Sequence, residues 1–570
     1  MESYTALSPW AEVDYADAKG LTPRLDTLEG KTIGLFAHFK GHSFLILKEI
    51  ENELAKRYPT ARFTTLQYPK DTSEIEHDPD FLPKFKEWLA GVDGVIAAYG
   101  DAGSCAMYHG YNTALVERLG KPAVLLAKTD VAMSARRGAS GRFVPNLRIV
   151  EAPVSLPDMS FVPALDQSLI DNVIRPNVLP LIDQLIDGLV KPLTDKEMEA
   201  PHSIANVYAD QTCTGTLEEV NQQFYANGWT TGLPVIPPTR EAVDEMMRGT
   251  DLPADHVVAE LPPMLGKATV EKIAINAVMA GCLPVHMPIL IAAVKGMVDP
   301  RIHLAGWTCS VAGFSPNLVV NGPIAKDVNM NATKAVMSMY FRSNASVGRA
   351  LSYIIMNVSG VRPGLEDNAY MGHEARFWTV MAEDEEHSPW KPLQTQFGFE
   401  ETDNAVTLFW SHDRAIFRGN RNVDLLLQTL CSYDNPWGFD PGCTFVVSAG
   451  TAKLLADAGM SREDAREYVF EYARKDSSTI NARWMKDNNH MPKSGLPLPG
   501  KGTYSARKYW TKEHINFVVA GSSLIDRGVA LVGGGDHGGP ACVKIELPSN
   551  WNDLVAEYSE KLASPSFASY

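Results

Sequence analysis

Cys105 is the residue with the clearest capacity for covalent chemistry, and it ends the glycine-rich segment Gly100 to Cys105. A predicted strand precedes the segment and a predicted helix follows it, so the thiol lies where backbone N–H groups and the helix dipole favour a thiolate. Gly103 and Ser104 are small enough for a tight turn and a close approach of substrate. Asp101 would oppose thiolate formation if it pointed inward. The segment predicts a nucleophilic thiol, with a buried inert cysteine as the alternative.

His109 follows Cys105 by four residues, which places both side chains on one face of the predicted helix. An imidazole at that distance can exchange a proton with the thiol. We therefore predict Cys105, His109 and Ser104 as catalytic residues, and Gly103 and Asp101 as substrate contacts.

The elements around this segment alternate between short apolar runs and amphipathic stretches, the pattern of a parallel sheet covered by helices on both faces. We expect a flavodoxin-like α/β domain, in which ligands gather beyond the carboxyl ends of the strands, where Cys105 would lie. The predicted strands are 32–37, 62–67, 94–99, 122–127 and 147–151, and the predicted helices are 43–57, 80–90, 106–119 and 177–189.

A chain of 570 residues is too long for one core and should hold at least two domains. We place a thiol domain at 1–195, a polar linker at 196–210, and a larger α/β or α+β domain at 211–570 that completes the active site. The apolar stretch 273–298 is interrupted by prolines, a histidine and a lysine, so it reads as two buried helices and not as a membrane span.

The composition argues for a folded intracellular protein, with 45% hydrophobic residues, 21% charged residues and a net charge of −16. Without a block of Lys and Arg we expect no nucleic-acid partner. The first residues carry acids and no basic start followed by an apolar stretch, so we expect a cytoplasmic location. The seven cysteines include no CxxC pair, which fits reduced thiols.

Several residues of the second half are further candidates for substrate binding. Trp229 lies in a loop stiffened by Gly and Pro, and Arg342 stands near a helix start where it could bind a carboxylate. Asp536 and His537 lie among glycines in 533–540, whose backbone N–H groups could hold an anion, although a surface turn explains this loop more simply. The scattered histidines lack metal-site spacing, so we expect neither a metal nor a cofactor.

The motif Ala102-Gly-Ser-Cys105, with the strand before it and Leu119 to Leu126 after it, resembles the UGSC family, named for a selenocysteine-Gly-Ser-Cys motif. Segments 228–229, 266–272, 276–281 and 320–323 resemble the long region that accompanies this domain in some members. The loop is more distantly similar to the selenocysteine loop of glycine-reductase-type proteins. That resemblance implies attack of a selenolate or thiolate on a carbon–heteroatom bond.

The motif departs from the family pattern at its first position, because Ala102 stands where the selenocysteine or first cysteine would be. A dithiol cycle within the motif is therefore excluded. Either Cys105 acts alone, which we favour, or a second thiol arrives from the C-terminal half, with Cys282 and Cys309 in the family-like stretches.

The combined expectation is a cysteine-dependent enzyme of lyase type, acting by addition, elimination or cleavage of a carbon–heteroatom bond. A small electrophilic substrate would bind between the two domains, and His109 or a C-terminal histidine would move the proton. The alternatives are a thiol oxidoreductase that pairs Cys105 with a distant cysteine and a non-catalytic binding module. A homodimer is expected as the commonest oligomeric state.

Overall fold

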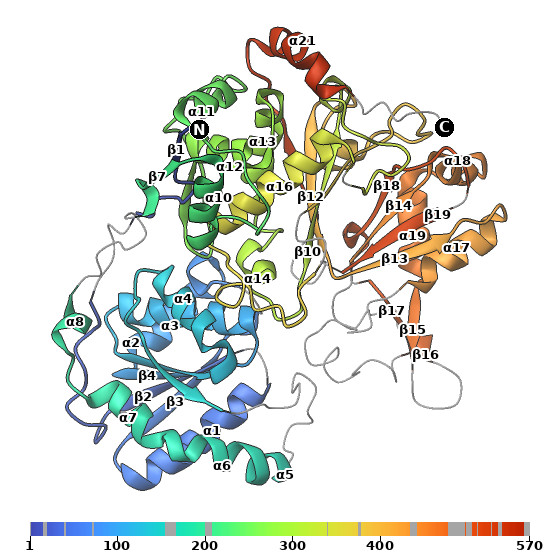
Figure 1. Cartoon of the computed structure of the whole chain (residues 1–570). Helices are drawn as coiled ribbons and strands as arrows, with labels where there is room; N and C mark the ends of the chain where they lie inside the picture. Colours follow the sequence, from blue (N-terminus) through green and yellow to red (C-terminus); the bar gives the residue numbers. More distant parts are fainter. Residues whose placement is uncertain are drawn as a thin grey trace.

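The structure is a computed structural model of mixed α/β architecture, with an N-terminal parallel sheet and further sheets and helices in the second half (Figure 1). The residues that it describes are 2–14, 20–38, 41–70, 73–153, 167–199, 208–338, 340–373, 378–433, 442–476, 496–497, 504–509, 511–525, 527–533 and 539–563.

The N-terminal sheet has five parallel strands in the order β3-β2-β4-β5-β6. This is the doubly wound order of flavodoxin-like folds, so the predicted fold class is confirmed. Its strands are β2 (Thr32–Ala37), β3 (Arg62–Gln67), β4 (Gly94–Gly100), β5 (Ala123–Lys128) and β6 (Arg148–Ala152).

Helices cover both faces of this sheet, and alternate residues of each strand pack against them. On β2, Leu35 joins the core under α1, whereas Phe36 joins the core on the other face. The helices of the first face are α1 (Gly41–Arg57), α6 (Arg175–Val178) and α7 (Ile182–Val190), and those of the second are α2 (Leu82–Ala90), α3 (Gly103–Arg118) and α4 (Ala132–Ser140).

Helix α3 begins at Gly103, three residues before its predicted start. Ala102 is extended and forms the N-cap, so Cys105 lies inside the first helical turn. Every residue from Gly103 to Glu117 is buried, because α3 is covered by the sheet on one side and by α14 (Leu304–Thr308) of the second half on another.

The second half contains two four-stranded sheets, ordered β11-β10-β12-β20 and β13-β19-β14-β18. The strands of the first are β10 (Ser315–Asn321), β11 (Thr379–Ala382), β12 (Ala405–Ser411) and β20 (Ala541–Lys544). The strands of the second are β13 (Asp413–Arg418), β14 (Cys443–Val447), β18 (Ile515–Val519) and β19 (Arg527–Val532).

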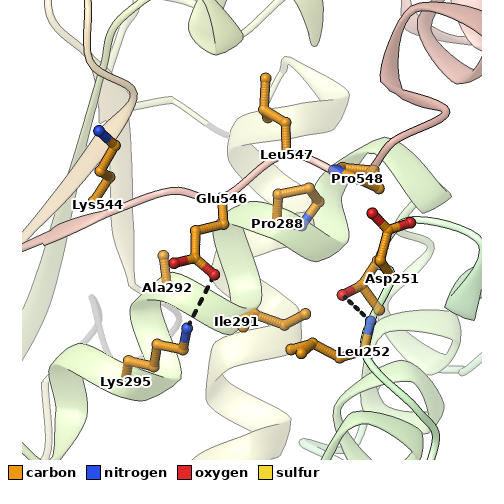
Figure 2. A pocket seen from close by; sticks show the side chains of 11 residues that line it. Asp251, Leu252, Pro288, Ile291, Ala292, Lys295, Lys544, Glu546, Leu547 and Pro548 are labelled. Carbon is orange, nitrogen blue, oxygen red and sulfur yellow. Dashed lines mark hydrogen bonds and ion pairs between the residues drawn. The ribbon is translucent and has the colours of Figure 1, made fainter.

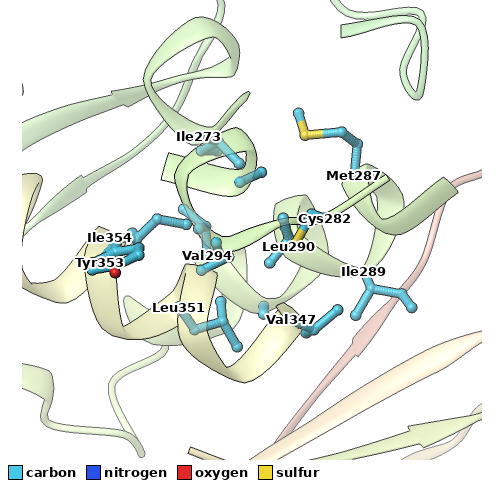
Figure 3. Packing of buried hydrophobic residues seen from close by; sticks show 14 of the residues in the cluster. Ile273, Cys282, Met287, Ile289, Leu290, Val294, Val347, Leu351, Tyr353 and Ile354 are labelled. Carbon is cyan, nitrogen blue, oxygen red and sulfur yellow. The ribbon is translucent and has the colours of Figure 1, made fainter. Parts of the chain in front are cut away.

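Three helices form the centre of the largest core, α12 (Val270–Ala280), α13 (Met287–Met297) and α16 (Arg342–Asn357) (Figure 3). The first two confirm the predicted pair of buried helices in 273–298. The remaining longer helices are α10 (Leu217–Ala226), α11 (Arg240–Met247), α17 (Val423–Ser432), α18 (Ala449–Asp457), α19 (Arg462–Tyr472) and α21 (Trp551–Leu562). Within the described ranges, no helix has both the length and the apolarity to cross a membrane.

The first strand of the chain packs with the second half. Strand β1 (Tyr4–Leu7) pairs with β7 (Thr212–Gly215), and Ala6 and Trp10 join the core around α12. Of the predicted linker, only 196–199 and 208–210 are described, so the boundary near residue 200 stays a prediction.

Candidate functional site

Strands β2 and β4 lie side by side, but their following helices turn to opposite faces of the sheet. Helix α1 packs into the core of one face and α3 into the core of the other. Such a reversal opens a crevice at the carboxyl ends of the two strands, where ligands of doubly wound folds bind. The loop that carries Cys105 leaves β4 at this point.

The β2–α1 connection brings two histidines to the same edge. His38 follows β2 directly, and His42 lies in the first turn of α1. The Nε2 atom of His42 is 3.4 Å from the Oδ2 atom of Asp101, with the His42 side chain fully buried and Asp101 14% exposed. The imidazole and the carboxylate therefore form a pair across the two loops, beside the first turn of α3.

These two histidines were missing from the sequence analysis. The available signal was the pair of histidines in His38-Phe-Lys-Gly-His42, immediately after the first strand of a doubly wound pattern. In a flavodoxin-like strand order the first and third strands are neighbours, which places these histidines beside the loop that carries Cys105.

The carbonyl oxygen of Ala98 accepts several hydrogen bonds at the carboxyl ends of β2 and β4. It accepts hydrogen bonds from the backbone N–H of His38 (3.1 Å), from the Ser43 hydroxyl and from the His109 ring. Ser43 Oγ also accepts from the His38 N–H, at 2.8 Å. The register of β4 with β5 shifts between Ala98 and Gly100. One carbonyl at this irregularity thus positions the β2–α1 loop relative to α3.

His109 is buried between the helix and the sheet. Its ring lies 5.2 Å from the Phe36 ring and 5.6 Å from the His38 ring, measured between centroids. Burial, and then the neighbouring His38, lowers the pKa of His109 well below its ordinary value of 6.5. A neutral imidazole whose N–H is donated to Ala98 suits an acceptor better than a cationic acid. Its predicted role in proton transfer stays a prediction.

The turn before Cys105 is closely packed, which explains the need for glycine. A Cβ atom at Gly103 would stand 2.1 Å from the carbonyl oxygen of Cys309, and one at Gly100 would stand 2.6 Å from the Cα of Ala106. Cys105 itself is 3% exposed. Its thiol lies at the third position of α3, in a first turn whose N-cap, Ala102, contributes no side-chain hydrogen bond.

A model of the UGSC family matches residues 5–176. This N-terminal part of the chain is therefore similar to the UGSC family, and we call residues 5–176 the UGSC region. No curated protein matches the chain. The matched range covers the whole five-stranded sheet and includes His42, Asp101 and Cys105, so the crevice at the β2–β4 edge lies entirely within the UGSC region.

The predicted site residues fall into two groups. Asp101, Gly103, Ser104, Cys105 and His109 lie together at the β2–β4 edge of the UGSC region.

The second-half candidates lie elsewhere or outside the described residues. Trp229 is 1% exposed and packs in the second-half core, with its ring 5.3 Å from the Phe224 ring. Arg342 is exposed at the first residue of α16, which packs against α12 and α13. Asp536 and His537 lie outside the described residues. The structure therefore brings neither Trp229 nor Arg342 to the thiol loop.

His286 stands close to Arg342 and holds the start of α13. Its Nδ1 accepts from the Leu283 N–H at 3.1 Å, and its Nε2 lies 3.0 Å from Ser343 Oγ, which donates to the Val328 carbonyl. Burial, with a smaller effect of Arg342, lowers the pKa of His286 to about 3. The neutral His286 ring therefore has a structural role in the second half.

This lowered pKa predicts a loss of stability in mild acid. The unfolded chain binds a proton at His286 near pH 6.5 and the folded chain does not, so stability is complete above that pH and falls as the pH decreases. Between pH 7 and pH 5 we expect a loss of about 2 kcal/mol, measured by urea unfolding with tryptophan fluorescence. The variant His286→Gln should lack this decrement, and exposed His256→Gln should keep it. An equal acid response in all three proteins would contradict the prediction.

Other features of the described residues do not form a second site. No group of three or more His, Cys, Asp or Glu among them could hold a metal ion. A hollow of about 130 Å³ between α13 and segment 544–548 has a charged rim, on which Figure 2 shows the ion pair of Lys295 with Glu546. The Lys295 Nζ atom lies 3.6 Å from Glu546 Oε2, and the Lys544 Nζ atom lies 2.6 Å from Asp403 Oδ1. We assign this hollow no ligand.

Proposed function

We propose that the protein is a cysteine-dependent enzyme in which the Cys105 thiolate acts on a small organic substrate and the His42–Asp101 pair handles the proton. The observation that carries the proposal is the meeting of His42 and Asp101 across the β2–β4 crevice, beside the helical turn that holds Cys105. Nucleophile, base and orienting carboxylate from separate loops are the usual parts of an activated-nucleophile site.

The pairing also answers the electrostatic objection to Asp101. A carboxylate near a thiol disfavours the thiolate, but here its Oδ2 faces the His42 imidazole. Once His42 has accepted the proton of the Cys105 thiol, the imidazole would balance the carboxylate, and the α3 dipole would add to the stabilisation of the thiolate. In the proposed reaction the thiolate forms a bond to an electrophilic carbon while the bond from that carbon to the heteroatom breaks, and the departing heteroatom takes its proton from His42. His42 then accepts a proton from the adjacent carbon as the S–C bond breaks, which regenerates the thiolate and makes the net reaction an elimination.

The positions of the other thiols support action by Cys105 alone. Cys309 is fully buried in a cluster with Met107, Tyr108 and Tyr111 of α3. Cys282 lies within the second-half core (Figure 3), where burial raises its pKa to about 12. Addition, elimination or carbon–heteroatom cleavage needs no second thiol, so these reaction classes fit best.

A thiolate titration tests the proposal without knowledge of the substrate. Thiolate ultraviolet absorbance is followed against pH for the wild type, and the curve of Cys105→Ser is subtracted to isolate Cys105. We expect a Cys105 pKa below the ordinary value of about 8.5, because transfer of the thiol proton to His42 and the start of α3 favour the anion over the cost of burial. In a His42→Gln background the same subtraction should give a pKa about one unit higher.

Cys431 supplies the matched control. Burial raises the pKa of its half-buried thiol to about 11, so subtraction of the Cys431→Ser curve should reveal a titration only in strong base. A Cys105 thiol that titrates at or above its ordinary pKa, with no response to His42→Gln, would refute the proposed function.

A further inference from the structure

Residues 366–370 of the second half follow the turn at Arg362 and form a strap across the UGSC region. Its even-numbered side chains contact three successive elements of that region. Glu366 lies 3.0 Å from Arg137 of α4, and the Tyr370 hydroxyl bonds to the side chain of Lys128 at the end of β5. Asn368 lies between them and contacts both α3 and α4.

Asn368 makes the densest set of contacts in the strap. Its Nδ2 atom donates to Ser134 Oγ at 2.6 Å, to the Cys309 carbonyl at 3.2 Å and to the Glu366 carbonyl at 2.9 Å. Ser134 belongs to α4 of the UGSC region, and the other two belong to the second half. One amide group therefore joins both halves of the chain.

The strap meets the UGSC region at the turn that holds the thiol. A Cβ atom at Gly103 would stand 2.9 Å from the Cβ of Asn368 and 2.1 Å from the Cys309 carbonyl oxygen, the same oxygen that Asn368 binds. Gly103 is the first residue of α3 and Cys105 is the third. The amide thus holds a carbonyl against the backbone two residues before the thiol, which is 3% exposed.

We propose that Asn368 is a positioning residue of the Cys105 site, and that the strap covers the first turn of α3 and controls access to the thiol. The proposal rests on the proposed function of Cys105 and adds that the UGSC region forms a complete site only together with the second half. Asn368 acts through the Cys309 carbonyl and the Gly103 turn, and it takes no part in bond making.

The test is the rate of iodoacetamide labelling, read for each cysteine by mass spectrometry on the full-length native protein. Asn368→Ala removes all three donated hydrogen bonds, and Asn368→Asp removes them at nearly constant size. We expect Cys105 to react about tenfold faster in both variants, a change that corresponds to about 1.4 kcal/mol in the opening equilibrium. The rate of Cys431 should stay unchanged. If one variant fails to fold, the Cys105 labelling rate of the other variant still tests the proposal.

The matched control is Asn177→Ala on α6, which removes one hydrogen bond from Asn177 to the Val173 carbonyl, away from the strap. It should leave the Cys105 rate unchanged. An unchanged Cys105 rate in the Asn368 variants would overturn the proposal, and so would a parallel increase at Cys105, Cys213 and Cys431, which indicates general loosening.

The labelling is repeated at about pH 9.5, where a thiol with the ordinary pKa of about 8.5 is ionised. Access is then measured whatever the pKa of Cys105. An ordinary Cys105 pKa with a tenfold faster labelling reaction in the Asn368 variants would refute the catalytic role of Cys105. The proposed control of access by the strap would then stand. A lowered Cys105 pKa with no change in the labelling rate of the Asn368 variants would refute the control of access by the strap. The proposed catalytic role of Cys105 would then stand.

Discussion

Replacement of Cys105 by alanine is expected to reduce turnover by about 10³-fold or more, since the loss of a nucleophile leaves only binding and positioning to accelerate the reaction. The thiol lies in the first turn of α3, which begins two residues after Asp101 of the His42–Asp101 pair. The substitution removes one sulfur atom from a buried position, so a melting temperature close to that of the wild type would show that the loss is chemical.

The measurement is turnover on a substrate found by screening small electrophilic compounds with mass detection. Cys431→Ser is the matched control, because this thiol is half-buried in the second half and should leave turnover unchanged. Full activity of the Cys105→Ala variant on that substrate would contradict the assignment of the nucleophile.

Replacement of Glu383 by alanine is expected to lower the free energy of unfolding of the second half by about 3 to 5 kcal/mol. The Glu383 side chain is fully buried and accepts hydrogen bonds from Arg462 Nη2 (2.5 Å), the Leu393 N–H (2.6 Å), Asn321 Nδ2 (2.6 Å) and the Val519 N–H (3.3 Å). Arg462 is 5% exposed, so the variant leaves a buried cation without its carboxylate. Glu383 also joins the two four-stranded sheets, which should separate more easily without it.

Urea unfolding of the second half, followed by tryptophan fluorescence, measures this loss. Glu386→Ala is the control, because Glu386 forms an exposed pair with Lys326 at 2.9 Å, and such surface pairs contribute little to stability. A Glu383→Ala protein as stable as the control would show that the buried carboxylate is not needed to hold the sheets together.

The secondary structure of the UGSC region could be predicted closely. The bounds of β2 (Thr32–Ala37) and β3 (Arg62–Gln67) match the predicted strands. Short apolar runs separated by amphipathic stretches are local features, and they require helices on both faces of a parallel sheet. The start of α3 was predicted three residues late, because Gly103 and Ser104 have low helix propensity and the packing of Gly103 against the second half cannot be read from the sequence.

The sequence by itself determined that Cys105 stands at a strand-to-helix junction of a doubly wound domain, because that position follows from local patterns of side chains. Only the tertiary structure decided its neighbours. His42 reaches Asp101 because β2 and β4 are adjacent in the sheet, and Asn368 reaches the Gly103 turn because the second half packs on α3. These contacts join residues far apart in the chain, and the strand order and domain packing that create them depend on the free energy of the whole fold.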